Sequence, residues 1–334
     1  MDVVLSHESA LACLRVRSLR GLPCVPSAPA HEVCPGWGDA PVDFSMMPTV
    51  SAAIRTLLQT QGWLGVPVHV IVPDAALRCR AQVVSNHVVA HLPAETRLVS
   101  IAPGVWCCPP ELVFVQLAET LPYEELLQVG FELCGSYRFY GRGHAVDSGA
   151  EHVGEARPLV NSKQIVAYAA TAQRLLGTKA ARSAASHVLD RAASPMQTQL
   201  ALLFSLPLRR GGYGFEPPVL NASIDLGIHS RTVPRQRFFA VDLLWPKARL
   251  AINYESDRSG GGSLHFTVAD ARRRMLLAAG VETISLTESQ LFDRAFMDRL
   301  ADHLAHRLGK STTQNKHSWS HERTTLRLRL LGHV

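Results

Sequence analysis

Residues 235–257, RQRFFAVDLLWPKARLAINYESD, predict two neighbouring β-strands joined by a short turn. Both runs are rich in β-branched, aromatic and other apolar residues, and Pro246 ends the first of them. A glycine loop, SGGGS, follows the pair. The segments TVADARRRMLLAAG, VETISLT and ESQLFDRAFMDRLADHLAHRLG then show the residue patterns of a helix, a strand and a helix.

A helix precedes this strand pair. Ser194 is placed to cap the segment SPMQTQLALLFSL, and Pro195 occupies its first helical position. The order becomes helix, strand, strand, helix, strand, helix. This order predicts an α/β domain in which a mixed sheet is flanked by helices.

Three polar side chains fall on the two strands of the pair. Asp242 lies in the first strand, and Asn253 and Glu255 share one face of the second, because side chains alternate along a strand. We expect these groups to converge at one end of the sheet. Converging oxygen ligands suit a hard divalent cation, and Asp242 and Glu255 are the candidate metal ligands. The competing interpretation is that they are ordinary polar residues at strand ends.

The stretch VDLLWPKARLAINYESD, followed by DARRRMLLAAG and VETISLT, resembles the core of very-short-patch-repair endonuclease-like proteins. These proteins form a branch of the restriction-endonuclease-like superfamily, whose site pattern is D…(D/E)xK. The resemblance covers roughly residues 194–309. It implies a restriction-endonuclease-like fold, a DNA partner and, if the centre is active, Mg²⁺. It also places Asp242 at the family's first-strand aspartate.

Two positions depart from that family pattern. The leading helix of the family usually has a glutamate where this chain has Gln197, and Asn253 stands at an acidic position of the second strand. A neutral amide is a poorer Mg²⁺ ligand than a carboxylate. In a second register Glu255 is the acid, and Asp257 then stands where a charge-stabilising lysine belongs. Both registers favour a degraded nuclease centre.

Further candidate residues follow the strand pair. The resemblance places His265 in a loop where the family often has a histidine, and gives it the role of general base if the enzyme is active. Arg272, Arg273 and Arg274 begin a helix face near the site. We expect phosphate contact from one or two of them, with a solvated charge run as the alternative.

The first half of the chain has a different pattern. Strands are expected in PVHVIV, VVSNHVVAHL and RLVSIAPGVWCC, and helices in residues 1–17, SAAIRTLLQTQG, ELVFVQLAETL and YEELLQVGFELCGSYRF. The strands and the last two helices resemble the middle region of AbiEi-type antitoxin proteins. His69, His87 and His91 have no recurrent metal-ligand spacing and are interpreted as polar residues on strand faces.

Four regions follow from these patterns. Residues 1–140 form a smaller α+β region of unknown role, and the Gly-rich segment 141–158 is a linker. Residues 159–310 combine a helical lead-in with the restriction-endonuclease-like domain. Residues 311–334 are expected to be a flexible basic tail.

Charge and composition narrow the function classes. The net charge of +6 divides into −4 over residues 1–150 and +10 over residues 151–334, so contact with a polyanion is expected in the second half. Hydrophobic residues make up 47% of the chain, which excludes a disordered or collagen-like protein. All seven cysteines lie in the first half, and none forms a CxxC pair, so we expect neither a disulfide framework nor a zinc site of that type. No apolar run spans a membrane, and we expect a cytoplasmic protein.

Three functional hypotheses remain open. The first is a DNA-binding protein with a restriction-endonuclease-like domain and a degraded centre, in the defence or toxin–antitoxin setting implied by the resemblances. The second is an active metal-dependent DNA endonuclease that uses Asp242 and Glu255. The third is a protein-interaction module that binds a partner through its N-terminal half and does not bind DNA. The sequence does not define the oligomeric state.

Overall fold

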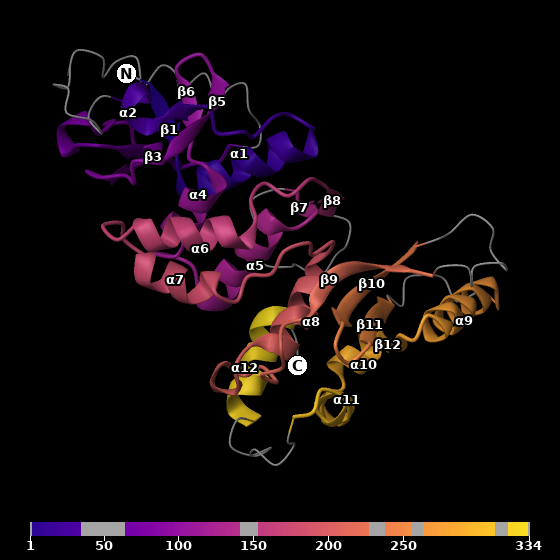
Figure 1. The fold of residues 1–334 in the computed structure, drawn as a ribbon. Helices are drawn as coiled ribbons and strands as arrows, with labels where there is room; N and C mark the ends of the chain where they lie inside the picture. Colours follow the sequence, from indigo (N-terminus) through magenta and orange to yellow (C-terminus); the bar gives the residue numbers. More distant parts are fainter. Residues whose placement is uncertain are drawn as a thin grey trace. The chain divides into compact units, whose positions relative to one another are not determined.

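Two units of structure divide the chain, Met1–Asp190 and Arg191–Val334 (Figure 1). The computed structural model describes residues 2–34, 64–140, 153–226, 238–255, 263–310 and 320–332, with side chains omitted for 263–270. The predicted helix at 51–62 lies outside the described residues. None of the described helices is long and apolar enough to cross a bilayer.

A six-stranded mixed sheet forms the centre of the first unit, in the order β2-β5-β6-β1-β3-β4. Its strands are β1 (Val3–Leu5), β2 (Ala28–Pro29), β3 (Val68–Val72), β4 (Val84–Val88), β5 (Arg97–Ala102) and β6 (Val105–Cys107). The three predicted strand regions are therefore confirmed. The buried β1 pairs in parallel with β6 and antiparallel with β3, so the N-terminal segment lies in the middle of the sheet.

Helices cover this sheet and extend the unit. They are α1 (His7–Leu19), α2 (Ala30–Val33), α4 (Pro110–Leu117), α5 (Tyr123–Cys134), α6 (Ser162–Thr171) and α7 (Thr178–Ala185), with a 3₁₀ turn η3 at Ala75–Leu77. α4 is almost wholly buried and packs against α1, α5, α6 and α7. A buried ion pair between Arg15 of α1 and Glu132 of α5, with two N–O distances of 2.8 and 2.7 Å, joins two of these helices.

The boundary between the units lies later than the sequence predicts. Helices α6 and α7 were expected to lead into the second domain, but they bury their apolar faces against α4 and α5. The carboxylate of Asp190 also accepts hydrogen bonds from the backbone N–H and the hydroxyl of Ser162, at 2.7 and 2.9 Å. Within the predicted linker, β8 (Val153–Glu155) pairs antiparallel with β7 (Tyr137–Phe139). Residues 141–152 lie outside the described residues.

A four-stranded mixed sheet, in the order β12-β11-β10-β9, forms the second unit. Its strands are β9 (Val219–Asp225), β10 (Phe238–Trp245), β11 (Leu250–Glu255) and β12 (Glu282–Thr287), and its helical elements are α8 (Pro195–Ser205), η5 (Leu208–Arg210), α9 (Ser263–Ala278), α10 (Glu288–Phe292), α11 (Arg294–Arg307) and α12 (Ser320–Leu331). β9, β10 and β11 are antiparallel neighbours, whereas β12 is parallel to β11 after the α9 crossover. Both units are thus α/β structures with mixed sheets and flanking helices.

The two faces of the second sheet meet different helices. Val241, its neighbour Ala222 on β9 and Leu276 of α9 belong to one apolar cluster. Asp242 points to the opposite face, because neighbouring side chains of a strand alternate. Gln197 of α8 contacts Asp242, so α8 lies over that second face. The polar candidate residues therefore lie between the sheet and α8.

Two elements of this unit differ from the sequence prediction. No strand is predicted over the segment VLNASID, but it forms β9, in which Leu220 and Ala222 are buried and which pairs with β10. Residues 320–331 of the predicted flexible tail form α12. Leu326 and Leu330 of this helix are buried, and the backbone carbonyl of Leu330 accepts a 2.7 Å hydrogen bond from Gln199 of α8.

Candidate functional site

Local structure positions Gln197, Asp242 and Asn253. The Ser194 hydroxyl accepts the Gln197 N–H, which fixes the first turn of α8 and confirms the predicted cap. The antiparallel register of β10 and β11, with Leu243 opposite Ile252, places Asp242 beside Asn253 on the same face. Asp242 and Asn253 therefore lie side by side, as strand alternation predicts, and Gln197 of α8 reaches Asp242 from the other end of the unit's sequence.

Hydrogen bonds connect the three residues closely. Gln197 Nε2 donates to Asp242 Oδ1 at 2.8 Å, and the Tyr254 N–H donates to Asp242 Oδ2 at 2.7 Å. Asn253 Oδ1 accepts the N–H of Asp242 at 3.1 Å, and Gln197 Oε1 accepts the N–H of Ala193 at 2.7 Å. Every side-chain oxygen in this group accepts a hydrogen bond from an N–H.

The electrostatics of Asp242 reflect opposing effects. Burial raises the pKa of Asp242 above its ordinary value, while the hydrogen bonds from Tyr254 and Gln197 and the charge of Arg272 act to lower it. Gln197 and Asn253 bring no charge. Asp242 is therefore the single carboxylate of this hydrogen-bonded group.

Glu255 lies at the exposed end of the same sheet face. Its carboxylate accepts a 2.6 Å hydrogen bond from the hydroxyl of Ser285, which lies in β12 beside Asn253. Glu255 shares the face of Asn253 two residues further along the strand. No described hydrogen bond joins it to Asp242, so it lies beside the hydrogen-bonded group rather than within it. Asp257, the alternative lysine position, lies outside the described residues.

The remaining predicted residues lie on α9. His265 was expected in a loop, but its backbone is helical, and its side chain lies outside the described residues. Arg272 donates to the carbonyl of Ala240 and lies 5.8 Å from the ring centre of Phe239. Arg273 and Arg274 are exposed. Arg272 therefore packs against β10, and the side chains of the next two arginines are accessible to solvent.

The hydrogen-bonded group does not fit Mg²⁺. This ion is usually bound by one or two carboxylates, waters and substrate phosphates, in near-octahedral geometry. Here one partly buried carboxylate has both oxygens engaged by N–H donors, and its two neighbours are amides. The arrangement stabilises the contact between α8 and the sheet without a cation.

Comparison with known protein families, curated proteins and solved structures finds no match to this chain. The restriction-endonuclease-like assignment and the AbiEi-type likeness thus rest on the sequence resemblances alone.

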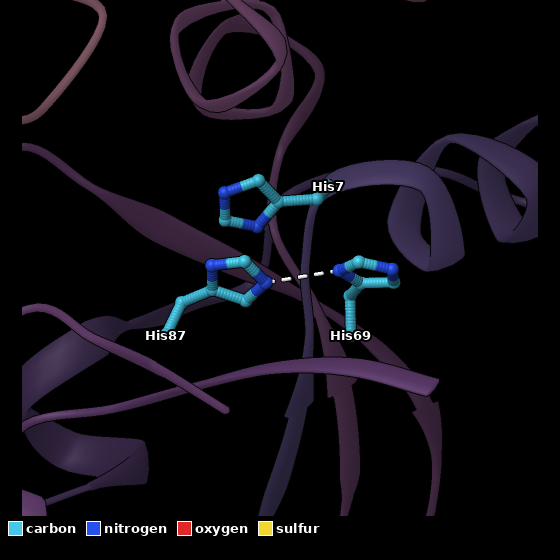
Figure 2. A group of neighbouring side chains, drawn as sticks. All are labelled: His7, His69 and His87. Atoms are coloured by element: carbon cyan, nitrogen blue, oxygen red, sulfur yellow. Dashed lines mark hydrogen bonds between the residues drawn. The ribbon is translucent and has the colours of Figure 1, made fainter. Parts of the chain in front are cut away.

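A second polar group lies in the first unit and was missed by sequence reasoning. His7, His69 and His87 each have a ring nitrogen within 4.8 Å of the ring nitrogens of the other two (Figure 2). His91, which was considered with His69 and His87, is exposed and is not part of the group. His7 comes from the start of α1, about 60 residues before β3, so spacing alone could not connect it.

Burial controls the charge of this histidine group. Burial, together with the charges of His87 and His69, lowers the pKa of His7 to about 3. Burial and the neighbouring His69 also lower the pKa of His87. His7 and His87 are therefore neutral imidazoles at physiological pH.

Proposed function

We propose that residues 191–334 form a restriction-endonuclease-like domain that binds DNA and whose nuclease centre is degraded. The observation that carries this proposal is the contact of Gln197, Asp242 and Asn253. The family resemblance implies acids at two of these positions, and this chain satisfies the remaining aspartate with amide and backbone N–H groups.

Charge supports a polyanionic partner for this unit. Residues 191–334 contain 20 Lys and Arg against 12 Asp and Glu, a net charge of +8, whereas residues 1–190 contain 14 against 16, a net charge of −2. Exposed arginines bind phosphate oxygens well, because the planar guanidinium can donate two parallel hydrogen bonds. Arg273 and Arg274 are the candidate phosphate contacts on α9.

DNA binding is tested by its dependence on salt. We expect the full chain to bind a labelled duplex in fluorescence anisotropy, with an affinity that falls steeply between about 50 and 200 mM salt. The variant Arg273→Glu/Arg274→Glu should bind more weakly, and its log–log salt slope should fall by about 1.8 if two phosphate contacts are lost.

A matched charge reversal in the first unit provides the control. Lys179 and Arg182 are exposed on α7, and the variant Lys179→Glu/Arg182→Glu makes the same change in net charge. This control should keep the wild-type salt slope. Binding that is absent, insensitive to salt or equally weakened by both variants would instead favour the protein-interaction hypothesis.

Cleavage distinguishes the degraded centre from an active one. Plasmid incubated with the full chain and Mg²⁺ or Mn²⁺ should remain intact. Cleavage that disappears in Asp242→Asn and Glu255→Gln, while both variants remain folded by circular dichroism, would establish the active endonuclease and refute the degraded centre. Cleavage that persists in both variants would point to a contaminating nuclease.

A further inference from the structure

We propose that His7, His69 and His87 bind a zinc ion, with the carboxylate of Glu8 as the fourth ligand. The three histidines come from separate parts of the first unit: the start of α1, β3 and β4. β3 and β4 are parallel neighbours in which His87 lies beside Ile71, so His69 and His87 share one face of the sheet. The ion would join both strands to α1.

The distances between ring nitrogens suit a tetrahedral ion. His69 Nδ1 and His87 Nε2 lie 2.9 Å apart (Figure 2). Tetrahedral zinc with Zn–N bonds of about 2.0–2.1 Å holds its ligand nitrogens about 3.3 Å apart. These two rings need to separate by only a few tenths of an ångström, and the other separations, which are at most 4.8 Å, need to close by no more than about 1.5 Å.

Glu8 provides an independent observation at the same place. Its Oε2 lies 3.5 Å from Nδ1 of His69, and it is buried without a hydrogen-bond partner among the described residues. A buried carboxylate oxygen without a partner is costly in a folded protein. A cation beside the three imidazoles would supply the missing interaction.

The backbone at His7 is also unusual. Its φ angle is 48°, in the left-handed region that residues with a side chain rarely adopt. Its backbone N–H donates to Gln116 Oε1 at 3.1 Å, and its Nδ1 lies 3.0 Å from the hydroxyl of Ser6. The His7 ring is stacked on that of His87, with 3.6 Å between the ring centres and 21° between the ring planes, so the His7 ring would turn to point a nitrogen at an ion shared with His87. Such outliers persist where the surrounding structure enforces them, often at binding sites.

The donor set selects the class of metal. Three imidazoles and one carboxylate suit Zn²⁺ and its neighbours in the first transition row, whereas Mg²⁺ and Ca²⁺ prefer oxygen ligands alone. The seven cysteines form no disulfide among the residues that the structure describes, and their thiols compete as zinc ligands. The competing interpretation is a hydrogen-bonded histidine stack that binds no ion.

Titration of the full chain with metal tests the proposal. After treatment with a chelator, the protein should bind one equivalent of Zn²⁺ at the histidine group by isothermal titration calorimetry. With Co²⁺, the bound ion should show visible bands of tetrahedral nitrogen and oxygen coordination. The spectrum should lack the intense near-ultraviolet charge-transfer band of cobalt–thiolate bonds. The presence of that band would show that cysteines bind the ion.

Variants assign the ligands. His87→Gln is the primary variant, because β4 is an edge strand and His87 is only partly buried. This variant should weaken Zn²⁺ binding by about 100-fold or more, and Glu8→Gln should weaken it by about 10-fold or more. Even mutation of residues that only hydrogen-bond to metal ligands lowers metal affinity by about 10–100-fold. His91→Gln, an exposed histidine in the same region, should bind like the wild type.

The outcomes separate the two interpretations. Circular dichroism of the metal-free variants shows whether each remains folded. If His87→Gln does not fold, Glu8→Gln provides the second test. The proposal is overturned if the wild type binds no Zn²⁺ at micromolar concentrations, if the cobalt spectrum shows thiolate bonds, or if folded His87→Gln and Glu8→Gln bind as tightly as His91→Gln.

Discussion

Replacing Gln197 by glutamate would set two carboxyl groups against each other where α8 meets β10. The amide nitrogen of Gln197 lies 2.8 Å from Asp242 Oδ1, and at an effective dielectric constant of about 20 two full charges at that distance repel by about 6 kcal/mol. Keeping one carboxyl protonated costs about 1.4 kcal/mol for each pH unit above the ordinary glutamate pKa of about 4.3, which is about 3.7 kcal/mol at pH 7. Protonation is the cheaper route, so Gln197→Glu should lose about 4 kcal/mol of stability at pH 7.

The sign of the pH dependence follows from this proton. The folded variant retains one proton that the unfolded chain releases, because the folded pair has a raised pKa. Its stability relative to the wild type is therefore greatest in acid and is lost as pH rises above about 4.3. We expect a deficit of about 1 kcal/mol at pH 5 and about 4 kcal/mol at pH 7. In thermal unfolding this corresponds to about 2–4 °C and 8–16 °C for a unit of this size.

A swapped pair provides the control. In Gln197→Glu/Asp242→Asn, the new amide can donate to the new carboxylate and still accept the N–H of Tyr254, while the carboxylate can accept the N–H of Ala193. The double variant should recover most of the stability lost by Gln197→Glu and lose its extra pH dependence. The reasoning fails if urea unfolding shows the double variant to be as unstable as Gln197→Glu, or if the deficit of Gln197→Glu is the same at pH 5 and pH 7.

Two further predictions concern packing in each unit. Arg15→Met leaves Glu132 buried without its charged partner, and should lower the free energy of unfolding in urea by about 3–5 kcal/mol. The double variant Arg15→Met/Glu132→Leu should recover much of that stability. Lys247→Ala breaks the exposed pair with Glu216 and should lower the free energy of unfolding by no more than about 1 kcal/mol. If Arg15→Met lowers it by the same small amount, the pair of Arg15 and Glu132 does not behave as a buried ion pair. Gly211→Ala adds a Cβ against the backbone of Glu322 in α12 at a φ of 84°, whereas Gly309→Ala at a φ of 66° meets no atom of the described residues within 4 Å. Gly211→Ala should therefore be the less stable variant by more than about 1 kcal/mol, and equal stability would argue against the docking of α12.

Local sequence rules predicted that Asp242 and Asn253 lie side by side, whereas Glu255, which was expected to converge with them, forms its hydrogen bond with Ser285. A helix cap fixed the position of Gln197, strand alternation fixed the faces of Asp242 and Asn253, and the short turn between β10 and β11 fixed their register. Each of these constraints acts within a few residues of chain. The contact between Gln197 and Asp242 additionally required the family resemblance, because nothing local connects α8 to β10.

Long-range pairing explains what the sequence did not predict. The histidine group depends on the parallel pairing of β3 and β4 and on β1 inserting between β3 and β6, and neither arrangement has a local pattern. In α12, two arginines that suggested a solvated tail are buried. Arg323 lies 3.2 Å from Asp298 and 4.4 Å from the Tyr213 ring centre, and Arg327 donates to the carbonyl of Leu291 at 2.6 Å. Partners brought by the fold make these charged residues compatible with burial.

The docking of α12 on α8 also sets an order of events during synthesis. About 115 residues separate the end of α8 from the start of α12, and ribosomes add about 5–20 residues per second. For roughly 6–23 s the amide of Gln199 is without the Leu330 carbonyl, and the apolar surface of α8 that α12 later covers is open to other chains and to chaperones. The first unit, whose segments are complete by Asp190, can fold during this interval, so slow translation beyond α8 would prolong the exposure of the second unit alone.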